Sequence, residues 1–141
     1  MKRTGTAVWK GGLRDGKGTV STQSGVLAET QYSFSARFEN GQGTNPEELI
    51  AAAHAGCFSM ALSGQLEAIG VKAESIRTTA AVSLEKTDAG FAIPSVHLDV
   101  VVHAPGADRG AVEKAAQTAE TTCPVSKVLN ARITMNARIE G

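Results

Sequence analysis

Small and apolar residues fill one long stretch of the chain, from Leu49 to Leu62, almost without interruption. Because they would occupy nearly every side of a helix, they predict a central helix with other elements on most of its faces. Asn45 suits the N-cap, Pro46 the first helical position, and Glu48 the capping-box position. Gly70 is a natural stop signal, so the predicted helix runs from Pro46 to just before Gly70.

Apolar and polar residues alternate in the second half of the chain with the period of two that is typical of half-buried strands. Residues 76–84 and 96–102 predict a long antiparallel hairpin, with its turn at Lys86–Gly90. A helix capped by Asp108 and a last strand over residues 133–139 follow. The order of elements predicts an α+β fold.

In the first half of the chain, apolar and polar residues alternate over shorter stretches. Residues 5–10 predict a strand, and residues 19–22 and 26–27 predict a short hairpin around Ser24 and Gly25. Residues 32–38 predict a further half-buried strand, which would put Arg37 on the face opposite the aromatic side chains.

Length and charge narrow the class of protein. A chain of 141 residues predicts one domain, residues 1–141. The 14 basic and 14 acidic residues form no like-charge run, which argues against nucleic-acid or anionic-membrane partners. We expect no signal peptide, and no apolar run that reaches the ~20 residues of a membrane span. The composition therefore favours a soluble cytoplasmic protein.

The cysteines are candidates for chemistry. Two cysteines in a cytoplasmic protein disfavour a structural disulfide, and with three scattered histidines they offer no metal-ligand spacing. If Pro124 opens a short helix, Cys123 lies at its N-cap, where backbone N–H groups favour a thiolate.

Cys57 lies in the middle of the central helix and gains no such help. On its own stretch a buried structural thiol is the stronger interpretation, and reactivity would require a cation such as Arg37. Glu47 could hold Arg37 by a bidentate pair. Ten residues of straight helix put Glu47 about 15 Å along the axis from Cys57. Glu47 is therefore no direct base, and it contributes only if the helix begins after Pro46 or a second subunit completes the site.

His54 lies one helical turn before Cys57 and could polarise the thiol. A hydrogen-bonded or surface histidine is the stronger interpretation from the sequence.

Three motifs occur together in this chain: Gly43–Leu49, Ala55–Phe58 and Cys123–Ser126. With these motifs, the chain resembles the osmotically inducible protein C (OsmC) family of peroxidases over nearly its whole length. Arg37, within Phe34–Phe38, has the position found in the osmotically inducible branch rather than the organic hydroperoxide resistance branch.

The resemblance implies an OsmC-like fold of antiparallel sheets around a long central helix, as an intertwined homodimer with two sites at the subunit interface. It implies a thiol peroxidase of organic hydroperoxides, without metal or other cofactor, that acts in oxidative and osmotic stress. Cys57 would be the peroxidatic thiol and Cys123 the resolving thiol. Arg37 would stabilise the Cys57 thiolate and Glu47 would orient Arg37.

The resemblance also implies that an external dithiol, of the protein-bound lipoyl type, restores both thiols. An apolar surround would favour organic hydroperoxides, and the sequence offers plausible lining residues: Phe38, Ile50, Phe58 and Met60.

Two alternatives remain at this level. In the first, Cys123–Ser126 is a CxxS half-motif, and Cys123 is the primary nucleophile of a thiol-disulfide exchanger. In the second, both cysteines are inert and the protein is a non-catalytic module that binds an apolar small ligand.

Overall fold

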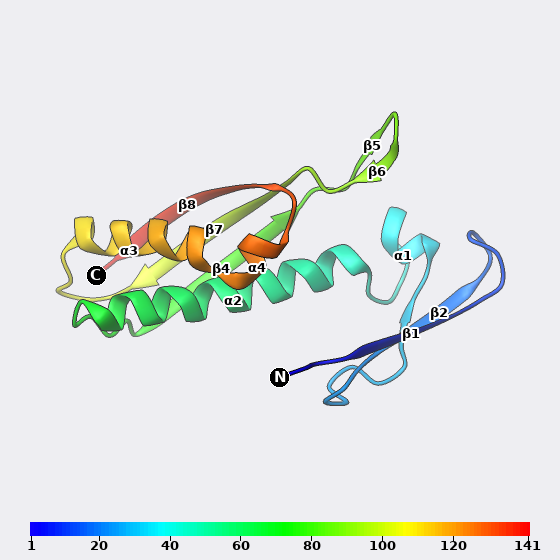
Figure 1. The fold of residues 1–141 in the computed structure, drawn as a ribbon, viewed down its shortest axis with the longest axis horizontal. Coiled ribbons are helices and arrows are strands. Elements are labelled where there is room, and N and C mark those ends of the chain that lie inside the picture. The colour runs from blue at the N-terminus through cyan, green and yellow to red at the C-terminus, as the bar shows by residue number, and fades with distance from the viewer. The chain divides into compact units, whose positions relative to one another are not determined.

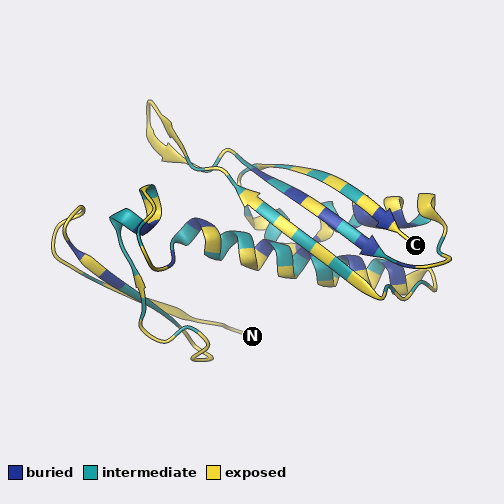
Figure 2. Cartoon of the chain, turned by 180° about the vertical axis from the view of Figure 1, so that it is seen from behind, coloured by how far each residue is buried: buried dark blue, intermediate teal, exposed yellow.

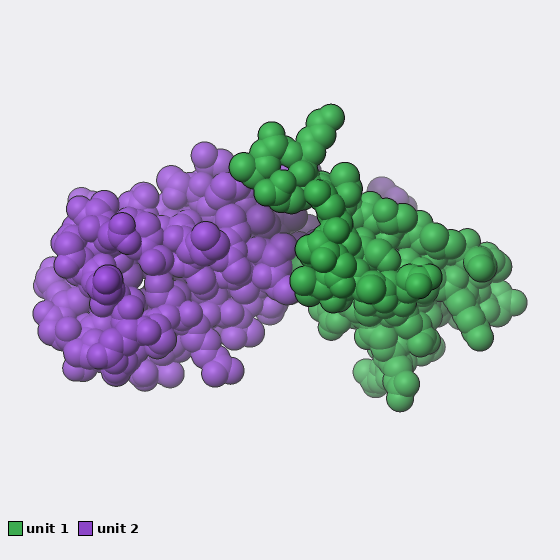
Figure 3. All heavy atoms as spheres, turned by 90° about the horizontal axis from the view of Figure 1, so that it is seen from below, with its two compact units in different colours: residues 1–49 green, residues 50–141 purple.

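The computed structural model describes all residues, 1–141. Its contacts divide the chain into two compact units, Met1–Leu49 and Ile50–Gly141, which Figure 3 colours separately. The prediction of one domain stays a prediction, and each unit is described by itself.

Unit 1 is built on a three-stranded antiparallel sheet in the order β1-β2-β3, with β1 at Gly5–Lys10, β2 at Lys17–Thr22 and β3 at Thr30–Tyr32. The first strand is as predicted. The predicted hairpin around Gly25 exists, but its second arm begins at Thr30 rather than Val26. Val26 and Leu27 lie in the connecting loop, where the Leu27 carbonyl accepts from the Thr22 N–H at 2.9 Å.

The predicted strand over residues 32–38 is wrong, because Phe34–Phe38 forms a short helix, α1. Ser33 caps it by accepting a hydrogen bond from the Ala36 N–H at 3.1 Å. Phe34 and Phe38 are then one turn apart, and their ring centroids lie 4.8 Å from each other. Arg37 is consequently beside the aromatic side chains rather than opposite them, with its guanidinium carbon 5.2 Å from the Phe38 ring centroid.

The predicted central helix is α2, Pro46–Ala68. Asn45 caps it, since its side-chain oxygen accepts from the Glu48 N–H at 2.8 Å. At the other end the Val71 N–H donates to Leu66 and the Gly70 N–H to Glu67, with Gly70 at φ +77°. These two bonds form a Schellman motif, which explains why the helix stops here.

Unit 2 holds a three-stranded sheet in the order β4-β7-β8, with β4 at Ser75–Val82, β7 at Ser95–His103 and β8 at Arg132–Glu140. The predicted antiparallel hairpin of β4 and β7 is confirmed, with Ile76 opposite Val102 and Val82 opposite Val96. β8 pairs with β7 in parallel, so this part of the sheet is not antiparallel as expected. The predicted turn carries a small ribbon instead, β5 at Glu85–Thr87 and β6 at Gly90–Ala92.

Two helices cover one face of this sheet, α2 and α3, which spans Arg109–Thr122 (Figure 1). The predicted Asp108 cap is confirmed, since its carboxylate accepts from the Ala111 N–H at 3.1 Å. A short helix, α4, follows at Pro124–Val128. The alternation of apolar residues along β7 places one set of side chains in the core, and these are all buried: Val96, Leu98, Val100 and Val102.

In unit 2, α2 buries only one stripe: His54, Phe58, Leu62 and Leu66. Figure 2 shows the sheet from its uncovered side, where exposed and partly buried residues alternate along β4 and β8. The expectation that elements cover most faces of α2 is therefore not met within one chain. Met60 is 79% exposed on the helix.

By length and composition alone, α2 is apolar enough to cross a membrane, a test that the core helix of a soluble protein also passes. By this test of helix length and hydropathy, the expectation that no apolar segment is long enough to span a membrane does not hold. The helix nevertheless has polar partners within the protein, such as the 2.8 Å hydrogen bond between the Ser59 and Thr78 hydroxyls.

Candidate active site

The two cysteines of unit 2 are brought together by α2 and by the junction of α3 with α4. Cys57 lies midway along α2 and is partly exposed, whereas Cys123 is fully buried. The Cys123 N–H closes α3 by donating to the Ala119 carbonyl at 3.0 Å. Pro124 opens α4, so Cys123 is at its N-cap as the sequence predicts.

The sulfur atoms of Cys57 and Cys123 lie 3.0 Å apart, and both cysteines are free. At this distance one S–H proton lies between the two sulfur atoms. A small approach would convert the contact into a disulfide, whose sulfurs are about 2 Å apart. The thiols therefore form a pair that can be oxidised reversibly.

Residues at the start of α4 determine which of the two thiols ionises more readily. Burial raises the pKa of Cys123, but hydrogen bonds from Cys57, from the N–H and hydroxyl of Ser126, and from the Val125 N–H outweigh it, so the pKa is lowered. Burial also raises the pKa of Cys57, and the bond to Cys123 adds to it, against a smaller opposing effect of the Val125 N–H. The opposite directions of these two pKa shifts favour the thiolate on Cys123 over the thiolate on Cys57.

His54 is buried one turn before Cys57 and is neither exposed nor free. Its Nε2 lies 2.7 Å from the Ser126 hydroxyl, while its Nδ1 is buried without a hydrogen-bond partner. The interpretation of a hydrogen-bonded histidine is thus correct for one ring nitrogen. The sequence could not identify Ser126 as the partner, because 72 residues separate the two.

In unit 1, Arg37 and Glu47 form the bidentate pair that the sequence suggested. Arg37 Nε lies 3.0 Å from Glu47 Oε1, and Arg37 Nη2 lies 3.1 Å from Glu47 Oε2. The Glu47 side chain is 11% exposed and that of Arg37 is 38% exposed. A buried carboxylate thus fixes a partly exposed guanidinium that still has N–H donors for another group.

An aromatic cleft of about 240 Å³ lies beside Arg37. Its lining residues are Trp9, Leu13, Tyr32, Ser33, Phe34, Arg37 and Phe38. Of the lining residues suggested by the sequence, Phe38 is present here, whereas Phe58 is in the hydrophobic core of unit 2. Trp9, Tyr32 and Phe34 were missed, although their shared aromatic character near Arg37 was a usable signal.

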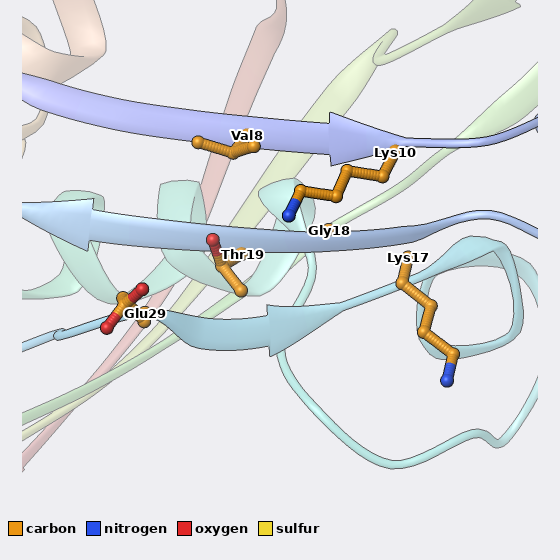
Figure 4. A pocket seen from close by; sticks show the side chains of 6 residues that line it. All are labelled: Val8, Lys10, Lys17, Gly18, Thr19 and Glu29. Atoms are coloured by element: carbon orange, nitrogen blue, oxygen red, sulfur yellow. The ribbon is translucent and has the colours of Figure 1, made fainter.

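A second cleft of unit 1, of about 390 Å³, lies on one face of β1 and β2 (Figure 4). It combines Lys10 and Lys17 with Val8, Thr19 and Glu29, and it contains none of the predicted site residues. No group of three or more His, Cys, Asp or Glu side chains is placed to hold a metal ion.

An α+β chain with two free cysteines in contact, one of them at a helix N-terminus, is a cysteine-based redox protein. The family model of OsmC-like proteins matches residues 39–138. The chain belongs to the OsmC family.

Its relatives include both branches of this family. It is 52% identical over 140 residues to Peroxiredoxin OsmC of Escherichia coli, covering 99% of this chain and 98% of that protein. It is 27% identical to the organic hydroperoxide resistance protein OhrB of Bacillus subtilis, covering 87% of this chain and 89% of that protein.

Solved structures have the same fold. The crystal structure of OhrB from Bacillus subtilis matches with a TM-score of 0.70 at 26% identity, covering 96% of this chain and 98% of that chain. An OsmC-like protein from Mycoplasma pneumoniae matches with a TM-score of 0.79 at 16% identity, covering 100% and 99% of the two chains. The predicted OsmC-like α+β fold is confirmed.

Proposed function

We propose that this chain reduces organic hydroperoxides to alcohols, with Cys57 as the attacking thiol and Cys123 as the resolving thiol. The chain is a cysteine-based peroxidase, in keeping with its 52% identity to Peroxiredoxin OsmC over the full length. The observation that carries the proposed roles is the 3.0 Å separation of the two sulfur atoms.

The reaction has two oxidative steps. The Cys57 thiolate attacks the distal oxygen of the hydroperoxide, its O–O bond breaks, and the departing alkoxide takes a proton to become the alcohol. Cys57 is then a sulfenic acid. Attack by Cys123 forms the disulfide and releases water, and an external dithiol, of the lipoyl type, reduces the disulfide.

The first step needs a cation near Cys57, because burial and Cys123 raise the pKa of Cys57. Arg37 is our candidate, with Glu47 as the residue that orients it. Since α2 begins at Pro46, a later helix start does not shorten the distance between Glu47 and Cys57. We therefore propose that Arg37 and Glu47 of one subunit complete the site of the other subunit in a homodimer.

The aromatic cleft beside Arg37 favours an organic substrate. Its aromatic and aliphatic lining would bury the apolar part of a hydroperoxide, while the peroxide oxygens face the guanidinium. Hydrogen peroxide lacks that apolar part, and we expect it to react more weakly. We further propose that residues 1–141 act as one domain in the cytoplasm, in oxidative and osmotic stress defence.

Steady-state consumption of cumene hydroperoxide with dihydrolipoamide as the reductant tests this function. We expect turnover in the wild type and none in Cys57→Ser. Cys123→Ser should retain the first oxidation but lose turnover with the dithiol. A Cys57→Ser variant with wild-type turnover would contradict the assignment.

A second candidate function is thiol-disulfide exchange by Cys123, which the lowered pKa of this thiol favours. The two functions differ in which cysteine is oxidised first. Exchange requires that Cys123→Ser abolishes the sulfenic acid, whereas the peroxidase requires that this variant traps it on Cys57.

A further inference from the structure

We propose that His54 and Ser126 form a hydrogen-bonded relay that positions the Cys123 sulfur for its attack on oxidised Cys57. His54 is then a positioning residue for disulfide formation. This inference rests on the peroxidase function proposed above, and it concerns only the second oxidative step.

The geometry consists of two contacts between α2 and the start of α4. The sulfur atoms of Cys57 and Cys123 lie 3.0 Å apart. His54 lies three residues before Cys57, and Ser126 lies three residues after Cys123. His54 Nε2 and Ser126 Oγ lie 2.7 Å apart. Residues three apart lie on the same side of a helix, so both contacts are on the face that α2 presents to α4. The second contact therefore fixes the register in which the two sulfurs meet.

The hydrogen-bond inventory fixes the direction of the relay. The Ser126 hydroxyl and N–H both donate to the Cys123 sulfur and thereby favour its thiolate. A hydroxyl has only one proton, so when Ser126 donates it to the Cys123 thiolate, the Ser126 oxygen is left to accept from His54 Nε2–H. This direction requires the tautomer with its proton on Nε2, and it leaves a lone pair on Nδ1, which is buried without a hydrogen-bond partner.

His54 acts as a donor and not as a base. Burial lowers the pKa of His54, so the ring stays neutral and does not take up the proton that Cys123 releases. An apolar side chain in this place would leave no unpaired buried nitrogen. The bond to Ser126 thus gives the buried imidazole its one hydrogen-bond partner.

Disulfide formation from the Cys57 sulfenic acid needs no further oxidant or reductant. The Cys123 thiolate attacks the sulfur of Cys57–SOH, the S–S bond forms, and the S–O bond breaks. The leaving hydroxide combines with the proton that Cys123 has released, which gives one disulfide and one water. The relay holds the thiolate in place until its charge is lost in this attack.

The test is a single turnover with one equivalent of cumene hydroperoxide, in which a dimedone adduct reports Cys57 sulfenic acid and mass spectrometry reports the disulfide. In His54→Phe and Ser126→Ala we expect disulfide closure to slow about tenfold or more, the value of a hydrogen bond to a charged group. The sulfenic acid should accumulate. His54→Gln and Ser126→Thr, which restore a donor and a hydroxyl, should recover most of the rate.

Ser59→Ala is the matched control, because it removes a hydrogen bond of α2 to Thr78 and should leave closure unchanged. The 15N NMR signals of His54 should place its proton on Nε2. Wild-type closure rates in both His54→Phe and Ser126→Ala would overturn the relay, and Ser126→Ala alone decides if His54→Phe does not fold. A Cys123→Ser variant without any adduct on Cys57 would instead overturn the peroxidase proposal.

Discussion

The Arg37 guanidinium is held by two hydrogen bonds of 3.0 and 3.1 Å to one carboxylate, that of Glu47. Such a bidentate pair fixes the plane of the guanidinium as well as its position. Glu47 lies in the first turn of α2, where the helix dipole also favours its negative charge. At the residue scale, the pair sets the direction of the cation that we assign to the first oxidation.

Glu47→Gln should therefore lower the second-order rate constant for cumene hydroperoxide by about tenfold or more, through misplacement of Arg37. Stopped-flow measurement of Cys57 oxidation gives this rate constant. Glu48→Gln is the matched control on the same turn, because Glu48 accepts from the Thr44 hydroxyl at 2.6 Å and not from Arg37. Equal losses in both variants would show that the pair has no specific role.

The burial of His54 leads to a second prediction, which concerns the pH dependence of the free energy of unfolding. Its pKa in the folded protein is lowered by burial from an ordinary value near 6.5, so the fold disfavours the protonated ring. The stabilisation by neutral His54 is fully present above that value and is lost as the pH falls below it. Between the pKa of His54 in the unfolded protein and its lower pKa in the folded protein, the free energy of unfolding should fall by up to about 1.4 kcal/mol for each unit by which the pH is lowered.

Urea unfolding of wild type and His54→Gln at pH 7.5 and at acid pH measures this effect. His97 and His103 are present in both proteins, so their contributions cancel in the difference. An identical pH dependence in the two proteins would contradict the prediction.

Elements with explicit start and stop signals were predictable from the sequence. Asn45 and Asp108 cap α2 and α3 as expected, because their side chains accept from N–H groups three residues on. The stretch 32–38 was not predictable from its period of two, since a helix cap at Ser33 and the Phe34–Phe38 contact override that pattern. The partner of His54 also depends on tertiary structure alone.

At the scale of a single element, we predict how substitution of Gly70 at the C-terminal end of α2 changes stability. Gly70 has a φ of +77°, and a side chain there would meet nothing within 4 Å, so only backbone strain opposes substitution. Gly70→Ala should lower the free energy of unfolding by about 1 kcal/mol. Gly70→Asn should cost less, because asparagine tolerates this conformation better. Urea titration measures both, and equal stability of all three proteins would contradict the Schellman stop.

At the scale of the whole molecule, α2 is an apolar helix with an open face. Ala52, Ala53, Gly56 and Met60 are exposed on it, and a side chain at Gly56 would meet nothing within 4 Å. Exposed small and apolar residues of this kind are typical of helices covered by another chain. They support the homodimer that the family resemblance implies.

Subunit complementation tests whether the site spans two chains. Arg37→Ala and Cys57→Ser should each be inactive as homodimers. Co-expressed, they should form mixed dimers in which one of two sites is intact, with activity near about a quarter of wild type for random assembly. An inactive mixed dimer would mean that each chain supplies its own Arg37.

The central claim is that Cys57 is oxidised first and that Cys123 resolves it. One equivalent of cumene hydroperoxide is added to the reduced protein, and free thiols are counted in wild type and in Cys123→Ser. The account predicts the loss of two thiols in the wild type and of one in the variant. No loss of thiols in either protein would contradict it and would favour a non-catalytic module for apolar ligands.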